Sequence, residues 1–219
     1  MIEYLRKASL FSGLNKAQLQ TLATICTRKA YRGNTVLFRE KEPGATFYIV
    51  VTGSVKIYTS NHAGEEKILS VFHSGDSFGE LSLIDGKPRS ASAETLEDSI
   101  LFSLHGQDFI NALKNNFDIS LAIMRELSNR LRDTNQHVHD LTFLDARTRV
   151  IKNLIQLANK GGQRMGTQIV IKTALNYDEL ARMAGVTKNI LMQVLRDLQE
   201  KGMLTPGMND FTIDLTKLR

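Results

Sequence analysis

The residues best suited to chemistry lie within residues 78–93, a run that reads Phe-Gly-Glu-Leu-Ser-Leu-Ile-Asp-Gly-Lys-Pro-Arg-Ser-Ala-Ser-Ala. Gly79 lets the backbone approach a ligand closely because it has no Cβ. Arg89 offers a planar set of N–H donors that suits a phosphate, and Ser90 adds a hydroxyl beside it. A carboxylate is repelled by phosphate, so Glu80 is better suited to accept a hydrogen bond from a sugar hydroxyl. The run predicts a pocket for a small phosphorylated sugar; a glycine-rich surface turn with an exposed arginine is the alternative.

This run resembles the phosphate-binding cassette of cyclic-nucleotide-binding domains, in which Phe-Gly-Glu is followed by Arg-Ser-Ala at the spacing found here. The resemblance implies that Glu80 binds the ribose 2′-hydroxyl and that Arg89 with Ser90 binds the cyclic phosphate. Residues 80–84 are expected to form one helical turn whose N–H groups point toward the anion. The predicted ligand-binding residues of this cassette are Gly79, Glu80, Leu81, Arg89 and Ser90.

Short strands are expected to hold the cassette, because glycines recur around it at steps of 9 to 11 residues, from Gly33 to Gly86. Turns at that spacing are typical of an all-β sandwich or barrel. The order of the glycines is similar to that of the cyclic-nucleotide-binding β-roll. Short helices are expected in residues 2–26. Strands rich in β-branched and aromatic residues are expected at residues 36–38, 47–51, 55–58, 68–72 and 100–104.

One long helix is expected from residue 108 to about residue 140, a stretch without glycine or proline. Apolar residues at the a and d positions of a heptad repeat form the seam of a two-stranded coiled coil, so the chain is expected to be a homodimer. The seam consists of two series that repeat every seven residues: Met124, Leu131 and Val138, then Leu127, Thr134 and Leu141.

Thr134 is polar within this apolar seam, where a polar side chain can simply fix the register of the two helices. The segment also resembles the dimer helix of CRP/FNR transcription regulators, in which the residues at these two positions reach the base of the nucleotide. That resemblance implies ligand contacts from Thr134 and Asn135, and from Arg130 on the sugar-phosphate side. Asn135 stands where the cAMP receptor type has a serine, so the identity of the base stays open.

The C-terminal third carries a helix-turn-helix pattern. Asn176 is placed to cap a helix that Gly185 ends, and Thr187 is placed to cap a second helix over residues 188–201. A wing is expected over residues 202–215. The predicted DNA-binding residues, all on or beside the second helix, are Thr187, Lys188, Asn189, Met192, Gln193 and Arg196.

The resemblance to the CRP/FNR family covers nearly the whole chain and implies an α+β fold. Residues 1–107 are expected to form a cyclic-nucleotide-binding β-roll (a jelly roll), residues 108–144 a dimerisation helix and hinge, and residues 145–219 a winged helix-turn-helix. The recognition helix matches least, because the family commonly shows Arg-Glu-Thr-Val-x-Arg where this chain has Lys-Asn-Ile-Leu-Met-Gln from Lys188. Since Asn and Gln pair well with adenine, we expect a palindromic operator with altered, A·T-richer half-sites.

Charge is unevenly distributed along the 219 residues. The net charge is +5, and residues 145–219 hold 12 Lys and Arg against 7 Asp and Glu, so the whole excess lies there. A basic region beside a neutral one suggests a polyanionic partner, although a solvated charged surface is the plainer explanation. No apolar run approaches a membrane span, and the single cysteine, Cys26, lies in an apolar segment and is expected to be a buried thiol. A cytoplasmic protein is expected.

The resemblance implies a DNA-binding transcription regulator, not an enzyme, with no required cofactor and with cAMP as the foremost effector. Double-stranded DNA, a second copy of the chain and RNA polymerase are the partners that the resemblance implies, and no membrane. Two alternatives are a regulator whose sensor binds another ligand or none, and a cyclic-nucleotide module of an enzyme or channel. A haem or metal sensor is disfavoured because His137 and His139, two positions apart on a helix, face different ways.

Overall fold

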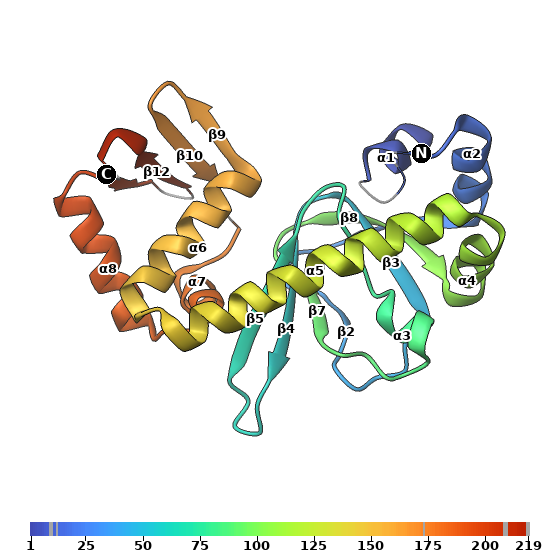
Figure 1. The fold of residues 1–219 in the computed structure, drawn as a ribbon, viewed down its shortest axis with the longest axis horizontal. Coiled ribbons are helices and arrows are strands. Elements are labelled where there is room, and N and C mark those ends of the chain that lie inside the picture. The colour runs from blue at the N-terminus through green and yellow to red at the C-terminus, as the bar shows by residue number, and fades with distance from the viewer. Residues whose placement is uncertain (9–10, 12, 173, 208–209, 218–219) are drawn as a thin grey trace. The chain divides into compact units, whose positions relative to one another are not determined.

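The structure is a computed structural model that describes residues 1–8, 11, 13–172, 174–207 and 210–217 (Figure 1). The chain divides into two structural units, Met1–Thr134 and Asn135–Arg219. The division falls inside one helix, between Thr134 and Asn135, which the family resemblance predicts to contact the ligand. The three predicted domains, with limits at residues 107 and 144, stay a prediction.

Two short helices, α1 (Ile2–Lys7) and α2 (Lys16–Ile25), begin the N-terminal unit, as the sequence predicts. The Asn15 side chain caps α2 by accepting from the backbone N–H of Gln18 at 3.0 Å, and the Gln18 side chain accepts from that of Asn15 at 2.8 Å. This exchange satisfies two backbone donors that the helix itself leaves open. Cys26 lies just beyond α2 and opens the first strand; its burial raises the pKa of the thiol to about 12.

The described part of this unit holds eight strands in two antiparallel sheets, with the orders β1-β8-β3-β6 and β2-β7-β4-β5. Neighbours in these sheets are mostly distant in sequence, as the crossing connections of a jelly roll require. All five predicted strands are confirmed, and three more are present. The strands are β1 (Cys26–Tyr31), β2 (Val36–Phe38), β3 (Thr46–Thr52), β4 (Val55–Ser60), β5 (Glu66–Phe72), β6 (Ser77–Phe78), β7 (Ser92–Thr95) and β8 (Ser99–His105).

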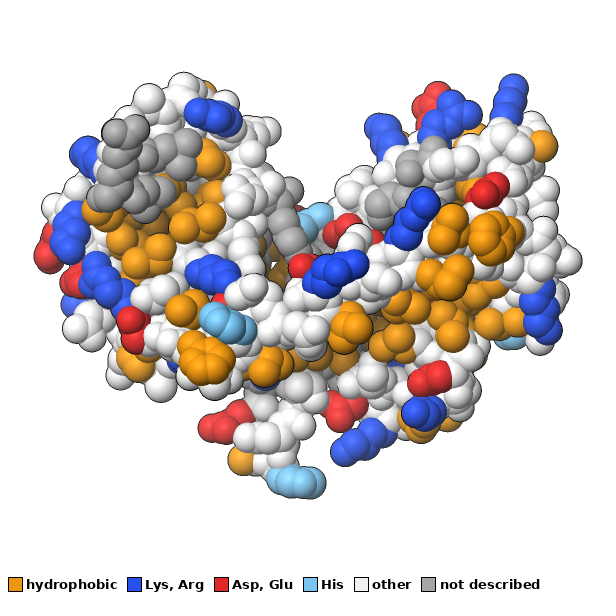
Figure 2. All heavy atoms as spheres, viewed as in Figure 1, with side chains coloured by type: hydrophobic (Ala, Val, Ile, Leu, Met, Phe, Trp, Pro, Cys, Tyr) orange, Lys and Arg blue, Asp and Glu red, His pale blue; other side chains and the backbone are white. Residues whose placement is uncertain are grey.

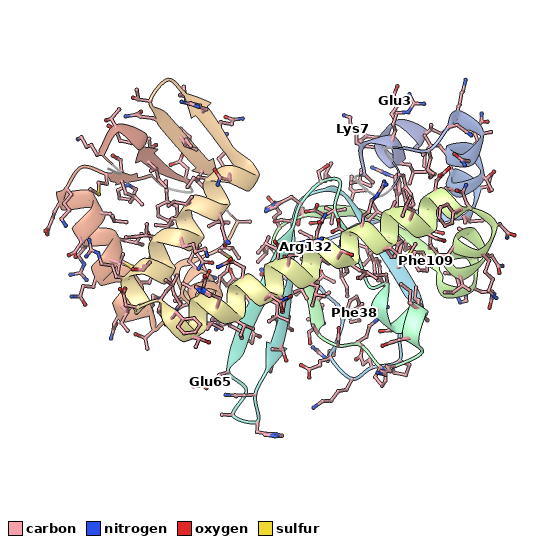
Figure 3. All side chains as sticks on the ribbon, viewed as in Figure 1. Glu3, Lys7, Phe38, Glu65, Phe109 and Arg132 are labelled. Carbon is pink, nitrogen blue, oxygen red and sulfur yellow. The ribbon has the colours of Figure 1, made fainter. Side chains whose placement is uncertain are left out.

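Two apolar clusters hold the N-terminal unit together. One joins β3, β6 and β8 of the first sheet to β4 and β7 of the second. The other lies between the first sheet and the helices. Because side chains alternate along a strand, Phe47 and Ile49 of β3 belong to the cluster with the helices, while Val50 belongs to the one between the sheets. Phe109, labelled in Figure 3, stacks on Phe47 with ring centroids 4.5 Å apart.

The single helix predicted from residue 108 to about residue 140 is wrong in one respect, because two helices occupy that stretch. They are α4 (Gly106–Asn115) and α5 (Phe117–Phe143), separated at Asn116, whose backbone is extended with φ −144° and ψ 102°. The Asn116 side chain accepts from the N–H groups of Asp118 at 3.2 Å and Ile119 at 3.4 Å. Asparagine breaks the helix here because its short amide bonds to the backbone in place of the helical pattern.

The described part of the C-terminal unit contains the end of α5, three further α-helices, a short 3-10 helix and a four-stranded sheet with the order β11-β12-β10-β9. The two strands predicted for the wing, β11 and β12, are therefore part of a larger sheet, and residues 208–209 between them lie outside the described residues. The elements are α6 (Ala146–Gly161), β9 (Gly162–Met165), β10 (Gln168–Lys172), α7 (Tyr177–Ala184), α8 (Lys188–Glu200), β11 (Leu204–Pro206), β12 (Asp210–Asp214) and the short 3-10 helix η2 (Leu215–Lys217).

The ends of α7 and α8 confirm the predicted caps. The Asn176 side chain accepts from the N–H of Glu179 at 3.0 Å, and the Glu179 carboxylate accepts from that of Asn176 at 3.0 Å. Gly185 ends α7 in the left-handed conformation, with φ +65°, which glycine adopts without strain. Thr187 caps α8 by accepting from the N–H of Ile190 at 3.4 Å. The connection between the two helices is thus fixed at both ends.

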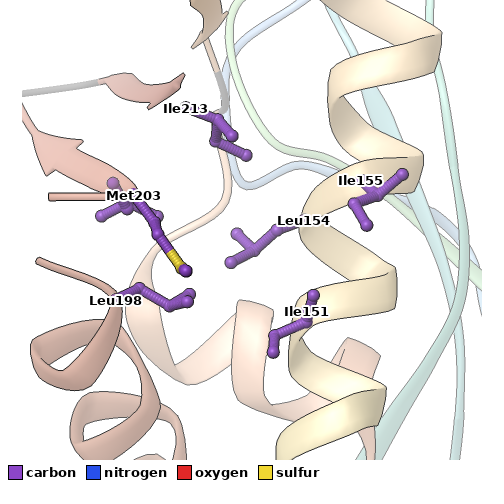
Figure 4. Close-up of a pocket in the computed structure, with 7 residues that line it drawn as sticks. Ile151, Leu154, Ile155, Leu198, Met203 and Ile213 are labelled. Atoms are coloured by element: carbon purple, nitrogen blue, oxygen red, sulfur yellow. The ribbon is translucent and has the colours of Figure 1, made fainter. Parts of the chain in front are cut away.

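Figure 4 shows an apolar hollow where α6, α8 and the sheet of the C-terminal unit meet. About 240 Å³ of space, part of it open to solvent, lies among seven apolar side chains. None of the described residues that line this hollow has a polar side chain to orient a ligand, so we interpret it as incomplete packing of the core. Its lining residues are Ile151, Leu154, Ile155, Leu198, Met203, Leu204 and Ile213.

Candidate functional site

Arg89 lies at the centre of the cassette and is only 5% exposed. Its Nη1 donates to the carbonyl of Gly79 at 2.8 Å, and its Nη2 donates to the carbonyl of Thr46 at 2.7 Å. The guanidinium also lies over the ring of Phe38, 4.1 Å from the centroid. Its Nε is buried without a hydrogen-bond partner. Among the described residues, this N–H donor of a buried cation therefore has no acceptor.

The electrostatic state of Arg89 favours an incoming anion. Burial lowers the pKa of Arg89, while Tyr48, Glu80 and Glu42 act to raise it. The guanidinium nevertheless stays charged at neutral pH, because the ordinary pKa of arginine lies above about 12. A buried charge is unfavourable unless it is paired, and carbonyl groups with an aromatic ring compensate for that burial only in part.

Aromatic rings link the two arginines of the site. Phe78 lies in the middle, with its ring centroid 6.1 Å from that of Phe38 and 5.8 Å from that of Phe72. Arg89 lies over Phe38, which comes from β2 (Figure 3), and Arg130 lies over Phe72 at 4.8 Å. Each guanidinium thus has an aromatic ring within cation–π distance.

Glu80 is 3% exposed and pairs with Arg130, which α5 brings to the cassette. The Glu80 carboxylate accepts from Nη1 of Arg130 at 2.8 Å. Arg130 also donates from Nη2 to the carbonyl of Ser77 and from Nε to the carboxylate of Glu126 at 3.0 Å. The cassette and α5 are therefore joined by an ion pair in which a backbone carbonyl and a second carboxylate also hold the arginine.

The remaining cassette residues differ in their positions. Gly79 has φ +86°, and a Cβ there would lie 2.9 Å from Nη1 of Arg89 and 3.0 Å from the carbonyl oxygen of Thr46, so glycine is required. The predicted helical turn is present as α3 (Leu81–Asp85). Leu81 and Ser90 lie at the surface, Leu81 with 43% of its area exposed.

Thr134 and Asn135 are exposed on α5, at the boundary between the two units. The Thr134 hydroxyl donates to the carbonyl of Arg130 in the preceding turn at 2.8 Å. Figure 2 shows hydrophobic side chains gathered along the part of α5 that belongs to the N-terminal unit. Such a stripe marks an interaction surface. Its exposed seam residues along the whole helix are Met124, Leu131, Val138 and Leu141.

The predicted DNA-contacting residues lie on the solvent-facing side of α8. The opposite side is buried, with Leu191, Val194 and Leu195 in the core of the C-terminal unit. Met192 is half-buried between these two sides. The exposed predicted residues are Thr187, Lys188, Asn189, Gln193 and Arg196.

The structure adds residues that the sequence pattern did not single out. Thr46 and Phe38 contact Arg89, and Glu126 contacts Arg130. Their signal in the sequence is weak because the strands and the helix that carry them join the cassette only through folding. Glu126 stands four residues before Arg130, a spacing at which opposite charges pair on a helix.

The described residues contain no group of three or more His, Cys, Asp and Glu side chains placed to hold a metal ion. In the same part of the chain, no helix is long and apolar enough to cross a membrane.

Comparison with known proteins relates the chain to one group of regulators. Residues 28–116 match the cyclic nucleotide-binding domain family. A CRP-like cAMP-activated global transcriptional regulator of Mycobacterium tuberculosis is 33% identical over 205 residues, which cover 93% of this chain and 91% of that protein. The cyclic AMP receptor protein of Thermus thermophilus is 29% identical over 203 residues, with coverage of 93% and 91%.

A solved structure extends the likeness to the fold. The c-di-GMP-responsive global regulator CLP of Xanthomonas campestris is 26% identical, with a TM-score of 0.78, over 91% of this chain and 99% of that one. The similarity thus spans both structural units, including the C-terminal unit that the domain match at residues 28–116 does not reach.

Proposed function

The chain belongs to the CRP/FNR family of transcription regulators, and we propose that it is a homodimeric DNA-binding regulator controlled by a cyclic nucleotide in the β-roll. The observation that carries this proposal is the cluster of Glu80, Arg89 and Arg130, in which a buried arginine keeps an open N–H donor. The cluster lies within or beside the region that matches cyclic nucleotide-binding domains.

In this proposal Arg89 binds the cyclic phosphate. A guanidinium has five N–H groups, and two of them donate to backbone carbonyls in this structure. Nε and the remaining N–H groups of the fork are then free to bind two oxygens of a phosphate side by side. Ser90 lies at the surface beside Arg89 in sequence, where its hydroxyl can add a further donor.

Glu80 is proposed to accept a hydrogen bond from the ribose 2′-hydroxyl. An ionised carboxylate has about four lone-pair positions, and the contact with Arg130 uses its Oε1 atom. Arg130 then has two roles, since it neutralises Glu80 and offers its remaining N–H groups on the sugar-phosphate side. Thr134 and Asn135 are exposed, as side chains that reach a base from the dimer helix need to be.

The foremost effector is cAMP, because the two curated relatives are named for it. The structural relative CLP is described as responsive to c-di-GMP, so a cyclic dinucleotide is included in the test. Isothermal titration of the full-length protein with cAMP, cGMP and c-di-GMP identifies the effector. Saturable binding of one of them supports the proposal, and binding of none of them contradicts it.

A second candidate, a regulator whose β-roll binds no ligand, is favoured by one observation. Glu80 and Arg89 already have internal partners, so the cluster is self-supporting as it stands. In that case the titration shows no heat with any nucleotide, yet the protein still selects a specific duplex. The two candidates therefore differ in the same titration.

DNA binding is proposed for the exposed side of α8. Helix-turn-helix proteins place this helix in the major groove, and a two-fold dimer places a pair of them about one helical turn (~34 Å) apart. Asn189 and Gln193 are suited to adenine and Lys188 to guanine, whereas Thr187 is suited to a phosphate. Selection from random duplexes tests this assignment, and a palindrome with altered, A·T-richer half-sites is expected.

Ligand control is proposed to act by population shift. A nucleotide that binds one arrangement of the dimer more tightly than others raises the population of that arrangement. The ion pair between Glu80 and Arg130 supplies the physical connection from the cassette to α5, which carries the dimer seam. The regulator is proposed to work in the cytoplasm, to contact RNA polymerase as its family does, and to have no enzymatic activity.

A further inference from the structure

We propose that Asp178 is a specificity-determining residue for DNA, because it holds the charge of Lys188 away from the phosphate backbone. The Nζ of Lys188 lies 2.7 Å from Oδ2 of Asp178, and the two side chains are 52% and 50% exposed. The pair joins the first turn of α7 to the first turn of α8. The inference rests on the proposed function, since it assumes that α8 enters the major groove.

Both partners of this pair are held on fixed elements. Of the two acidic residues in the first turn of α7, Glu179 is taken up by the cap with Asn176 and is buried. Asp178 is the exposed one. Lys188 is the first residue of α8, and Thr187 before it caps that helix. The ion pair therefore joins two helix starts whose positions the caps determine.

Helix electrostatics explain why the pair forms. A helix N-terminus carries a partial positive charge, so an acid is favoured there and a lysine is disfavoured. Asp178 is favoured at the start of α7, whereas Lys188 by itself would be disfavoured at the start of α8. A carboxylate 2.7 Å from the ammonium offsets that unfavourable charge. The position of Lys188 beside Asp178 is thus favoured over an extended conformation directed at another anion.

The pair changes what Lys188 can contribute to DNA binding. The ion pair of Lys188 and Asp178 has no net charge. It therefore contributes little to the attraction for phosphates that does not depend on sequence. The other two N–H groups of Lys188 can still donate to acceptors on a base edge, such as O6 and N7 of guanine. The carboxylate repels a phosphate that comes too close, which disfavours misplaced registers. Asp178 therefore weakens the contribution of Lys188 to phosphate binding, which all DNA shares, and preserves its contribution to base recognition.

Neutralising Asp178 should raise the affinity for non-specific DNA more than the affinity for the selected operator. In Asp178→Asn, Lys188 becomes free to bind phosphates. We expect affinity for a scrambled duplex to rise by roughly three- to tenfold, with the slope of log K against log salt steeper by about 1. Affinity for the selected duplex should change much less, so the ratio of specific to non-specific affinity should fall.

Asp197→Asn is the matched control. Asp197 also lies on α8 and forms an exposed ion pair, with Arg147, so its removal changes the net charge equally. It lies nine positions after Lys188, about 13 Å along the helix, which exceeds the screening length of about 8 Å at physiological salt. A general charge effect alters both variants alike, whereas the proposed effect alters the specificity ratio only in Asp178→Asn.

The test is fluorescence anisotropy of the full-length protein with the selected and the scrambled duplex, at several salt concentrations, with and without cAMP. The expected result is a lower specificity ratio in Asp178→Asn and in Asp178→Ser but not in Asp197→Asn. The effect should vanish when Lys188→Gln is also present. Equal ratios in the variants at both acids, or an effect that persists without Lys188, would overturn the inference. A wild-type protein that prefers no duplex would overturn the proposed function instead.

Discussion

The two structural units present their candidate functional residues in opposite ways. In the N-terminal unit, Glu80 and Arg89 are buried, 3% and 5% exposed, and bond to groups of the same unit. In the C-terminal unit, the candidate DNA-binding residues of α8 are exposed to solvent, except the half-buried Met192. The exposed ones are Lys188, Asn189, Gln193 and Arg196. A small ligand can be enclosed, but a polyanion many times longer than the protein can only be met by a surface.

This difference sets how strongly each region should respond to mutation and to salt. A charge in a buried site interacts strongly with its partners and is screened little. An exposed charge on α8 is weakened by salt, and many such contacts share the binding energy. Single substitutions should therefore have large effects in the cassette and smaller, position-specific effects on α8.

Replacing Arg89 should have the largest effect. In Arg89→Leu we expect affinity for the cyclic nucleotide to fall at least 100-fold, because the phosphate loses its buried cation. The carbonyls of Gly79 and Thr46 also lose their donor, which should lower the free energy of unfolding by about 1–3 kcal/mol each without unfolding the dimer. Isothermal titration and thermal melting measure the two effects. Arg28→Leu, at an exposed position on β1, is the control and should change neither.

Unchanged nucleotide affinity in Arg89→Leu would remove the phosphate role. That result would also remove the contrast between a buried ligand site in one unit and an exposed DNA-binding surface in the other. The cluster around Arg89 would then serve only to stabilise the fold.

Placing a charge in the seam of α5 should have the next largest effect, because the seam is the proposed dimer interface. Leu131 is 62% exposed in the single chain. We expect Leu131→Glu to give monomers in light scattering and to lose tight DNA binding, because a dimer would bury its charge. Asn129→Glu lies on another face of the same helix and should remain dimeric. A dimeric Leu131→Glu protein would place the interface elsewhere.

Replacing Gln193 should have a moderate, local effect. If Gln193 reads a base, Gln193→Ala should cost about 1–3 kcal/mol at one base pair of the operator and leave the others unchanged. Gln199→Ala, an exposed glutamine near the other end of α8, should have no such effect. Binding to a set of single-base operator variants measures this. A uniform loss for every duplex would instead indicate a phosphate contact.

The smallest effect concerns stability at low pH. Burial acts to raise the pKa of Asp140, but hydrogen bonds from Lys152 and Gln136 outweigh it, so the pKa lies below its ordinary value. A carboxyl group with a lowered pKa stabilises the fold at neutral pH, and this stabilisation is lost as the pH falls below about 4. The difference in melting temperature between the wild type and Asp140→Asn should therefore shrink as the pH falls from 7 to 3. A constant difference would contradict this reading.

The sequence predicts local structure well wherever a few neighbouring residues determine it. The caps at Asn176 and Thr187 and the turn at Gly185 are confirmed because each depends on residues within four positions. The break at Asn116 was missed because asparagine interrupts a helix only when its side chain bonds to the following turn. The signal was present, because Asn116 is followed by an acid two residues later as Asn176 is, and a lack of glycine and proline does not by itself predict a continuous helix.

Contacts within the site were harder to predict because they join distant segments. The cassette motif singles out Glu80 and Arg89, but it does not indicate that Thr46 and Phe38 hold Arg89. The ion pair between Asp178 and Lys188 is not predicted by the sequence pattern either, because it joins two different helices. Pairing between helices depends on their packing, which the pattern of one helix does not contain.

Control of DNA binding by a cyclic nucleotide is tested most simply by the affinity of the full-length protein for its selected operator, measured with and without cAMP. We predict that saturating cAMP raises operator affinity at least tenfold. Because coupling between two sites is reciprocal, the operator should raise cAMP affinity by the same factor. Arg89→Leu should bind the operator equally with and without cAMP. Operator binding that is identical in both conditions for the wild-type protein would contradict control by this nucleotide.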